Sequence, residues 1–295
     1  MRIFALELNN DIKGIDERKR YIEGLIATLP SPDLVVLPEL AICSYMASEA
    51  IWKYADKCGK DTTMWAMEMA KKYGTYIGVG YLDFEVGDYY NRYMIADGER
   101  VFGTVSKSEG EAAVFKRGDF GSIIDTPFGK VGIGICYDSR RKHFYDNVKD
   151  EELSLILFPH GAPADPKKPD EEIATNDYFC CAYRDAFSVP VVYVNSVGNL
   201  EYMPGMMGKM MAAYGFRMNG KSKIYSNSGR EILTDVKEAF GLDVELSPRS
   251  RGGDISFYGD DIIKANALFR ILVLRPDTKR GIQMYEKSKS NNFRR

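Results

Sequence analysis

The sequence predicts an α/β fold built on mixed β-sheets. Three observations favour this class: short apolar segments typical of strands recur along the chain, helical segments separate some of them, and two stretches with Gly and Asn have the pattern of β-hairpins. Hairpins join antiparallel strands, whereas strands connected through a helix can run parallel. We therefore expect sheets that contain both orientations.

The expected strands and helices alternate over much of the chain. Strands are predicted at residues 2–8, 33–39, 76–84, 92–98, 101–107, 130–137, 153–160 and 189–198. A helix is predicted over 16–30, where apolar residues at helical spacing form one face. These residues are Ile22, Leu25, Ile26 and Leu29. A second helix is predicted over 169–187, because this segment begins with Pro and acidic residues.

The two hairpins are predicted at residues 123–133 and 223–233, where turn residues interrupt β-rich flanks. No Pro- or Ser-rich linker, internal repeat or low-complexity block divides the 295 residues. We therefore expect one continuous domain over residues 1–295, in which the basic and polar segment 276–295 is a C-terminal tail.

The composition argues against several classes of protein. With 40 basic and 42 acidic residues, the formal net charge is -2, so no global field favours nucleic acid or an anionic membrane. The apolar run before Asn9 is too short for a signal peptide, and no apolar stretch approaches the length of about 20 residues that spans a bilayer. The five cysteines do not resemble a disulfide framework. We expect a soluble, cytoplasmic protein.

Three predicted strands end at residue types that can do chemistry, namely Glu39, Lys107 and Cys136. An unperturbed thiol has a pKa of about 8.5, so a nucleophilic cysteine needs a base or a nearby positive charge. Glu39 could accept the thiol proton, and Lys107 could stabilise the oxyanion of a tetrahedral intermediate. Each residue alone has an ordinary structural explanation, as a solvated charge or as small apolar filler. Only the combination indicates acyl transfer.

The segments around these residues resemble the motifs of the nitrilase superfamily, the carbon–nitrogen hydrolases. The segments are VVLPEL (35–40), YNRYMIADGERVFGTVSK (90–107) and GIGICYDSR (132–140), in the order that the family shows. The similarity continues through LILFPHGAP (155–163), AYRDAFSVPVVYVNSVG (182–198) and GKSKIYSNSGREIL (220–233). Within the α/β class, the resemblance implies a four-layer α-β-β-α sandwich in which two mixed β-sheets pack face to face.

The resemblance also implies catalytic roles for the residues that match. Glu39 would be the general base, Lys107 the cation that stabilises the oxyanion and Cys136 the nucleophile. The backbone N–H of Tyr137 would be a second oxyanion donor. Family members carry a further glutamate in the loop between the lysine and cysteine strands. Glu111 has the family's spacing to the Phe and Gly that follow, whereas the nearby Glu109 does not.

Other residues are expected around the substrate. Tyr45 matches a tyrosine that lines the pocket in the family, and Arg140 belongs to the family's motif after the cysteine. Arg140 could bind a substrate carboxylate or be purely structural. His160, at the end of its predicted strand, could reach the pocket or be a hydrogen-bonded structural histidine. The loop 106–118 lacks the His and Pro that are common in the family, and the usual aromatic-Pro-Glu sequence is missing after Arg140. Because these residues surround the pocket, the resemblance does not identify the substrate.

The resemblance implies hydrolysis of a carbon–nitrogen bond in a small non-peptide amide or N-carbamoyl compound, through an acyl group bound to Cys136. True nitrilases share the fold but typically have Trp-Glu after the cysteine, where this chain has Tyr137 and Asp138, and this favours an amidase or carbamoylase. Some relatives transfer acyl groups or supply ammonia to a synthetase domain, which this sequence lacks. The alternative that is not an enzyme is a non-catalytic scaffold protein that retains the binding pocket.

The remaining expectations concern partners. No metal or organic cofactor is expected, and a small molecule is the expected substrate. Residues 201–218 hold six of the thirteen methionines and favour core packing or an interface over a substrate lid. The C-terminal tail would be solvated, or alternatively an arm that crosses to a second subunit. Because family members often dimerise, we expect a homodimer or a higher homo-oligomer.

Overall fold

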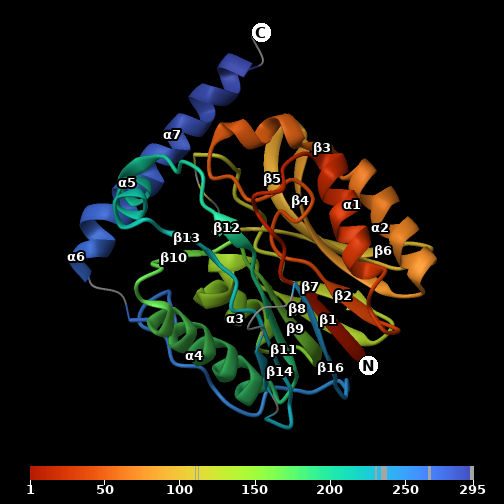
Figure 1. The fold of residues 1–295 in the computed structure, drawn as a ribbon. Helices are drawn as coiled ribbons and strands as arrows, with labels where there is room; N and C mark the ends of the chain where they lie inside the picture. Colours follow the sequence, from red (N-terminus) through yellow and green to blue (C-terminus); the bar gives the residue numbers. More distant parts are fainter. Residues whose placement is uncertain (110, 112, 230, 234–237, 265–266, 293–295) are drawn as a thin grey trace.

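Two large β-sheets face each other in the protein, and helices cover their outer surfaces (Figure 1). In the computed structural model the described residues are 1–109, 111, 113–229, 231–233, 238–264 and 267–292. The two sheets and the helices outside them form the four-layer α-β-β-α sandwich expected from the sequence, so the predicted fold class is confirmed.

The first sheet has seven strands, in the order β16-β1-β2-β4-β5-β6 with β3 paired to β4. Its strands β1, β2, β3 and β4 run parallel, whereas β16, β5 and β6 each pair antiparallel with a neighbour. The strands are β1 (Arg2–Leu6), β2 (Leu34–Val36), β3 (Asp56–Lys57), β4 (Tyr76–Glu85), β5 (Asp88–Ala96), β6 (Val101–Ser106) and β16 (Ala239–Asp243).

The second sheet has six strands, in the order β15-β14-β11-β9-β8-β7. Its strands β8, β9 and β11 run parallel and the others antiparallel, so both sheets are mixed, as predicted. The strands are β7 (Ile123–Thr126), β8 (Gly129–Ile133), β9 (Leu153–Pro159), β11 (Val191–Val194), β14 (Lys223–Tyr225) and β15 (Glu231–Leu233). A small third sheet, which was not predicted, consists of β10 (Pro163–Ala164), β13 (Arg217–Asn219) and β12 (Val197–Asn199).

The longer helices belong either to the outer layers or to the C-terminal part of the chain. The helices are α1 (Ile15–Ile26), α2 (Lys60–Tyr73), α3 (Lys142–Val148), α4 (Pro169–Phe187), α5 (Gly205–Tyr214), α6 (Ala267–Phe269) and α7 (Arg275–Asn292). The remaining elements of the described residues are two 3₁₀ segments, η1 (Glu49–Tyr54) and η2 (Cys136–Arg140), and a π-helical turn, η3 (Arg270–Leu274). Among the described residues, no helix is both long and apolar enough to span a membrane.

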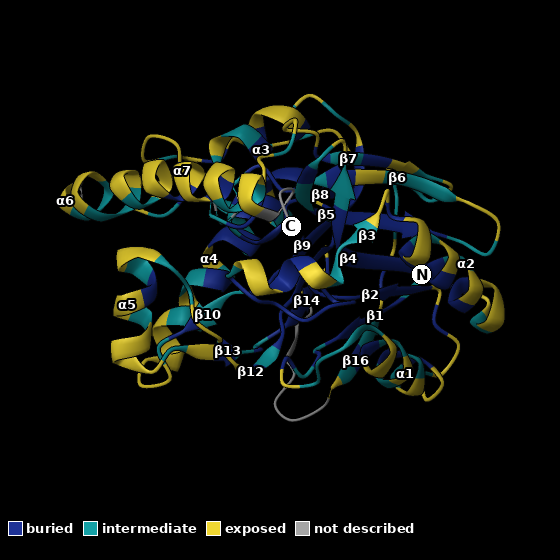
Figure 2. Ribbon diagram, turned by 90° about the horizontal axis from the view of Figure 1, so that it is seen from above, coloured by how far each residue is buried: buried dark blue, intermediate teal, exposed yellow. Residues whose placement is uncertain are grey.

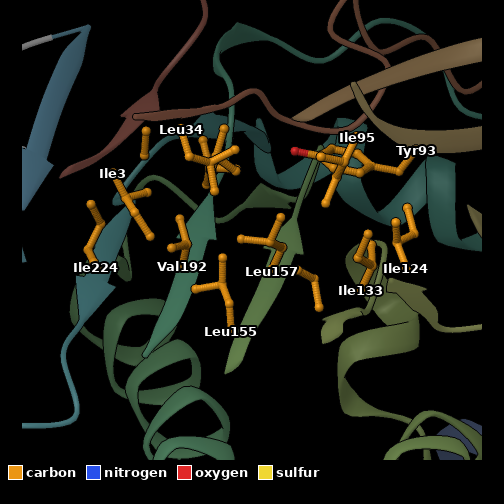
Figure 3. Packing of buried hydrophobic residues seen from close by; sticks show 14 of the residues in the cluster. Ile3, Leu34, Tyr93, Ile95, Ile124, Ile133, Leu155, Leu157, Val192 and Ile224 are labelled. Atoms are coloured by element: carbon orange, nitrogen blue, oxygen red, sulfur yellow. The ribbon is translucent and has the colours of Figure 1, made fainter. Parts of the chain in front are cut away.

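The core between the sheets is made of alternate residues of their central strands. Ile3 and Leu34 of the first sheet face Leu155, Leu157 and Val192 of the second, and all five are fully buried (Figure 3). Because successive side chains of a strand point to opposite faces, the residues between them point outward to the helices. This explains why these strands are apolar at nearly every position, since both of their faces are buried.

The outer layers bury the opposite faces of the sheets. Ile22 of α1 and Trp65 of α2 pack with Val35 of β2 outside the first sheet. Phe144 of α3 and Tyr183 of α4 form the corresponding cluster outside the second sheet. Full burial of an aliphatic or aromatic side chain contributes about 1.5–3 kcal/mol to the free energy of unfolding, so these clusters hold the layers together.

Several predicted elements end differently in the structure, among them the strands predicted over 33–39, 92–98 and 130–137, which end at Val36, Ala96 and Ile133. Residues 189–198 divide into β11 and β12, which lie in different sheets, because the Asn195 side chain bonds both the N–H and the carbonyl of Ala162 at 3.0 Å and bends the chain away. The helix predicted over 16–30 ends at Ile26 and continues as turns towards Pro30. The helix over 169–187 has the predicted bounds.

The C-terminal segment is a helix where a solvated tail was predicted. Helix α7 runs beside α5 and projects from the body of the molecule, as Figure 1 shows. Much of its surface is exposed (Figure 2), but Tyr285 is only 2% exposed and its ring meets Trp52 edge-on. The polar composition predicted a solvated tail, whereas residues 275–292 form a helix with many exposed side chains. It missed that one aromatic residue anchors this segment to the domain.

Candidate active site

The three strand ends singled out in the sequence come from both sheets. Glu39 follows β2 and Lys107 follows β6, both strands of the first sheet, whereas Cys136 follows β8 of the second sheet. All three side chains are buried. The site therefore lies where the two sheets meet, and it forms only when the sandwich is assembled.

Close backbone packing fixes the position of Glu39. Gly80 of β4 lies directly behind this residue, and a Cβ atom at position 80 would be 2.6 Å from both the Pro38 carbonyl oxygen and the Leu40 nitrogen. No side chain can occupy such a gap. Leu40 itself has a φ of 50°, in the left-handed region that turns the chain out of the strand.

Cys136 stands at a similar sharp turn. Its φ is 50°, which is unusual for a residue other than glycine. Ser139 Oγ donates a hydrogen bond of 2.6 Å to the Cys136 carbonyl and so closes the first turn of η2. The strained turn points the thiol into the site while the strand before it holds the backbone.

Lys107 and Asn91 together hold one oxygen of Glu39. Lys107 Nζ lies 2.6 Å from Glu39 Oε1, and Asn91 Nδ2 donates to the same oxygen at 2.7 Å. Glu39 Oε2 is buried and has no hydrogen-bond partner within the described part of the chain. An unpartnered carboxylate oxygen in a buried site is the one that is available to accept a proton.

A second carboxylate, Glu111, lies on the other side of Lys107. Its oxygens are 3.2 Å and 3.4 Å from Lys107 Nζ, and Tyr45 donates a hydrogen bond of 2.7 Å to its Oε1. Glu109 lies elsewhere, where it forms ion pairs of 2.9 Å with Arg117 and 3.2 Å with Arg141. The two loop glutamates thus differ in place, as their spacing in the sequence suggested.

Burial and charge keep the Cys136 thiol protonated at rest. Burial raises the pKa of Cys136 and Glu39 raises it further, whereas Lys107 and a hydrogen bond from the Gly161 backbone lower it. The net effect is a pKa well above the usual value. Because a thiol with a raised pKa is a weak nucleophile, it needs a base in contact when it reacts.

The pKa of Lys107 is raised although the residue is buried. Burial favours the neutral amine, but the negative charges of Glu111 and Glu39 and the hydrogen bond to Glu39 favour the ammonium form, which persists at neutral pH. Burial also raises the pKa of Glu39, and this effect is opposed by Lys107 and by the hydrogen bond from Asn91. A protonated lysine between two carboxylates is a fixed positive charge beside the thiol.

Comparison with known proteins identifies the family of the chain. The family model described as carbon-nitrogen hydrolase matches residues 13–232, which include Glu39, Lys107, Glu111 and Cys136. The chain belongs to the carbon-nitrogen hydrolase family. A carbon-nitrogen hydrolase from Helicobacter pylori has a similar fold, with a TM-score of 0.71 at 17% identity, over 83% of this chain and 89% of that one. An amidase from Nesterenkonia sp. gives a TM-score of 0.60 at 15% identity, over 84% and 88%.

Curated relatives match over shorter stretches. An omega-amidase from Xenopus laevis is 28% identical over 142 residues, which cover 43% of this chain and 50% of that protein. An omega-amidase from Bos taurus is 29% identical over 154 residues, which cover 46% and 55%. The chain thus spans about half the length of the curated relatives it matches.

In this member of the carbon-nitrogen hydrolase family, Asp261 organises the residues after the cysteine. Tyr137 Oη donates to Asp261 Oδ2 at 2.9 Å, and Arg140 Nη2 lies 3.1 Å from the same oxygen. The charge of Arg140 is therefore already paired with a buried carboxylate. This pairing favours the structural interpretation of Arg140 over binding of a substrate carboxylate.

His160 lies behind the cysteine turn. Its Nε2 is 3.2 Å from Ser139 Oγ, and its ring lies 4.5 Å from that of Tyr193. Since Ser139 donates to the Cys136 carbonyl, Nε2 of His160 must donate to Ser139. Burial lowers the pKa of His160 well below its usual value. These contacts favour a neutral, structural histidine that supports the turn.

Two further residues of the site lie in the motifs that carry the resemblance but were given no role in the site from the sequence. Asn91 lies in the middle of β5, and its contact with Glu39 depends on the pairing of distant strands. Asp138 accepts hydrogen bonds from the N–H groups of Ser108 at 2.8 Å and Glu109 at 2.6 Å, so it ties the loop after Lys107 to the cysteine turn. Across the described ranges, no three His, Cys, Asp or Glu side chains are grouped as a metal site requires.

Proposed function

We propose that the protein hydrolyses the carbon–nitrogen bond of a small non-peptide amide or N-carbamoyl compound through an acyl group on Cys136. The observation that carries the proposal is the pair of contacts at Glu39. Lys107 and Asn91 bind Oε1, while Oε2 is buried without a partner among the described residues. This arrangement suits a general base next to a buried thiol.

In the proposed first half-reaction, the Cys136 sulfur attacks the substrate carbonyl carbon and its proton passes to Glu39. The carbonyl π electrons move to oxygen, and the Lys107 ammonium with the Tyr137 N–H stabilises the oxyanion. When the tetrahedral intermediate collapses, the carbon–nitrogen bond breaks and Glu39 returns the proton to the leaving nitrogen. Ammonia or an amine leaves, and the acyl group stays on sulfur as a thioester.

In the second half-reaction, Glu39 removes a proton from water and the hydroxyl oxygen adds to the thioester carbonyl. The same donors stabilise the second oxyanion. Collapse breaks the carbon–sulfur bond, releases the acid and returns the proton to the Cys136 thiol. Glu111 holds Lys107 at 3.2 Å and Tyr45 at 2.7 Å, and it would orient the substrate nitrogen from this position.

Nitrile hydrolysis on the same fold is the second candidate. The pair Tyr137 and Asp138 after the nucleophile differs from the Trp-Glu typical of nitrilases and supports the amidase side. The side chain of Asp138 points to backbone N–H groups of the loop rather than to free space. A non-catalytic scaffold would have no use for a buried Lys107–Glu39 ion pair that interacts electrostatically with a buried thiol, because burying charge is costly without a function.

The test is release of ammonia from a panel of ω-amides, carbamoyl amino acids, carbamoyl amines and nitriles, with Cys136→Ala as the inactive control. We expect turnover of an amide or carbamoyl compound that the variant lacks. Turnover of nitriles alone would favour the second candidate, and no turnover of any class would favour the scaffold. The cytoplasmic location stays a prediction.

A further inference from the structure

A pocket of about 330 Å³ lies between helices α5 and α7, and Glu111 is among the residues that line it. The two helices lie side by side at the periphery of the molecule (Figure 1). Glu111 belongs both to this pocket and to the Lys107 contact of the site. A molecule whose carbonyl reaches Cys136 therefore has this pocket beside it.

Most of the pocket wall is apolar. Its largest apolar side chains are Met203, Met206, Met207, Leu274 and Met284. The exposed cations Lys209 and Arg280 also line the pocket, as do Glu111 of the candidate site and the fully buried Ala47. Methionine side chains are flexible and polarisable, so they fit closely around chains of different shape.

The wall formed by α7 is fixed at two places. Near its start, Asp277 Oδ2 accepts the backbone N–H of Met207 at 2.8 Å, which joins α7 to α5. Near its end, Tyr285 Oη donates to Asp88 at 2.8 Å and Lys289 Nζ lies 2.6 Å from the same carboxylate. A pocket whose walls are held in this way exists before the ligand arrives, which lowers the cost of binding.

We propose that this pocket binds a neutral apolar chain of the substrate, so that the preferred amide carries an aliphatic group of several carbons rather than only a short or polar one. The inference rests on the proposed function for the position of the carbonyl. Ligand pockets range from about 300 to 1,000 Å³ and are predominantly apolar. The pocket is therefore of the size for a single aliphatic chain and too small for a polymer.

The experiment measures binding of linear primary amides, from propanamide to octanamide, to full-length Cys136→Ala protein. We expect the Kd to fall by up to about fourfold for each added methylene until the pocket is filled. Met206→Gln and Met284→Gln keep the length of the side chain but make it polar, and each should flatten this dependence. Met210→Gln is the matched control, because Met210 lies on α5 but lines a different pocket.

The outcomes separate this inference from the proposed function. A Kd that does not change with chain length, or a dependence that Met210→Gln flattens as much as Met206→Gln, overturns the inference. The same amides given to the unsubstituted protein test the function through ammonia release. If the Kd depends on chain length but neither these amides nor any ω-amide or carbamoyl compound of the panel above releases ammonia, the pocket assignment stands and the proposed function fails. If ammonia appears but the Kd does not depend on chain length, the proposed function stands and the pocket assignment fails.

Discussion

Asn91 binds both halves of the ion pair at the centre of the site. Its Nδ2 donates to Glu39 Oε1 at 2.7 Å, and its backbone carbonyl accepts the N–H of Lys107 at 2.8 Å. A single residue of β5 thus sets the carboxylate and the start of the lysine loop relative to each other. This relationship makes Asn91 a positioning residue for the proposed base.

Asn91→Ala should therefore lower kcat/KM by about 10- to 100-fold, the usual effect of losing a hydrogen bond to a charged group. The hydrogen bond from Asn91 opposes the rise that burial causes in the pKa of Glu39, so its loss raises this pKa further. Because the proposed base must be ionised, the acid limb of the profile of kcat/KM against pH should move to higher pH. Asn227→Ala, at an exposed asparagine, is the control. An acid limb that stays in place contradicts the assignment.

The two loop glutamates should respond differently to the same substitution. Glu111→Gln removes a charge in contact with Lys107 and should lower kcat/KM by about 10- to 100-fold. Glu109→Gln removes a partner of Arg117 and Arg141 and should have little effect on turnover. The measurement is steady-state kinetics of both variants on one substrate. A greater loss in Glu109→Gln would mean that the two roles are reversed.

These residues also show how far the sequence predicts the site. Glu39, Lys107 and Cys136 were singled out because each follows an apolar segment, and their roles were predicted from the resemblance of the surrounding motifs to the family. The mixed sheets followed from helical segments and hairpins that can be read locally. The apolar segments and the helix and hairpin patterns involve residues close in the chain, so they can be recognised without knowledge of the tertiary structure.

The contacts that complete the site are of another kind. Asn91 and Asp261 reach their partners across strands or loops that are remote in the sequence, and no role in the site was predicted for either. The anchoring of α7 depends on Tyr285, one aromatic residue in a polar segment, and was missed for the same reason. Such contacts depend on which strands and loops pair over long distances in the sequence, and this pairing cannot be predicted from the local pattern of a single sequence.

Lys107→Arg should not restore activity, although the charge is kept. Lys107 is only 1% exposed and its ammonium fits between Glu39 and Glu111. A planar guanidinium is larger and cannot direct a compact charge at one oxygen. We expect kcat to fall by at least about 100-fold, as when an oxyanion donor is lost. Turnover close to that of the unsubstituted protein would show that Lys107 is not the oxyanion donor.

The protein should be at least a dimer in solution. Ile271 and Leu272 of η3 and Ile282 of α7 are 54%, 68% and 46% exposed, and such grouped apolar residues are typical of an interface. Light scattering at micromolar concentration should give the mass of a dimer or a larger oligomer, and Leu272→Glu should shift it towards the monomer. Val86→Glu, at an exposed hairpin tip, should leave the mass unchanged. A monomer for the unsubstituted protein contradicts this prediction.

The central claim is that the Cys136 thiol carries the acyl group. Cys136→Ala removes one small atom from a buried site and should abolish turnover while the fold is kept, and Cys136→Ser should be nearly inactive because a hydroxyl ionises far less readily. The most direct measurement is mass spectrometry of unsubstituted protein quenched during turnover. We predict a mass increase equal to the acyl group on the peptide that contains Cys136, with the other four cysteines unmodified. The acyl mass on another residue, or turnover that survives in Cys136→Ala, would contradict the account.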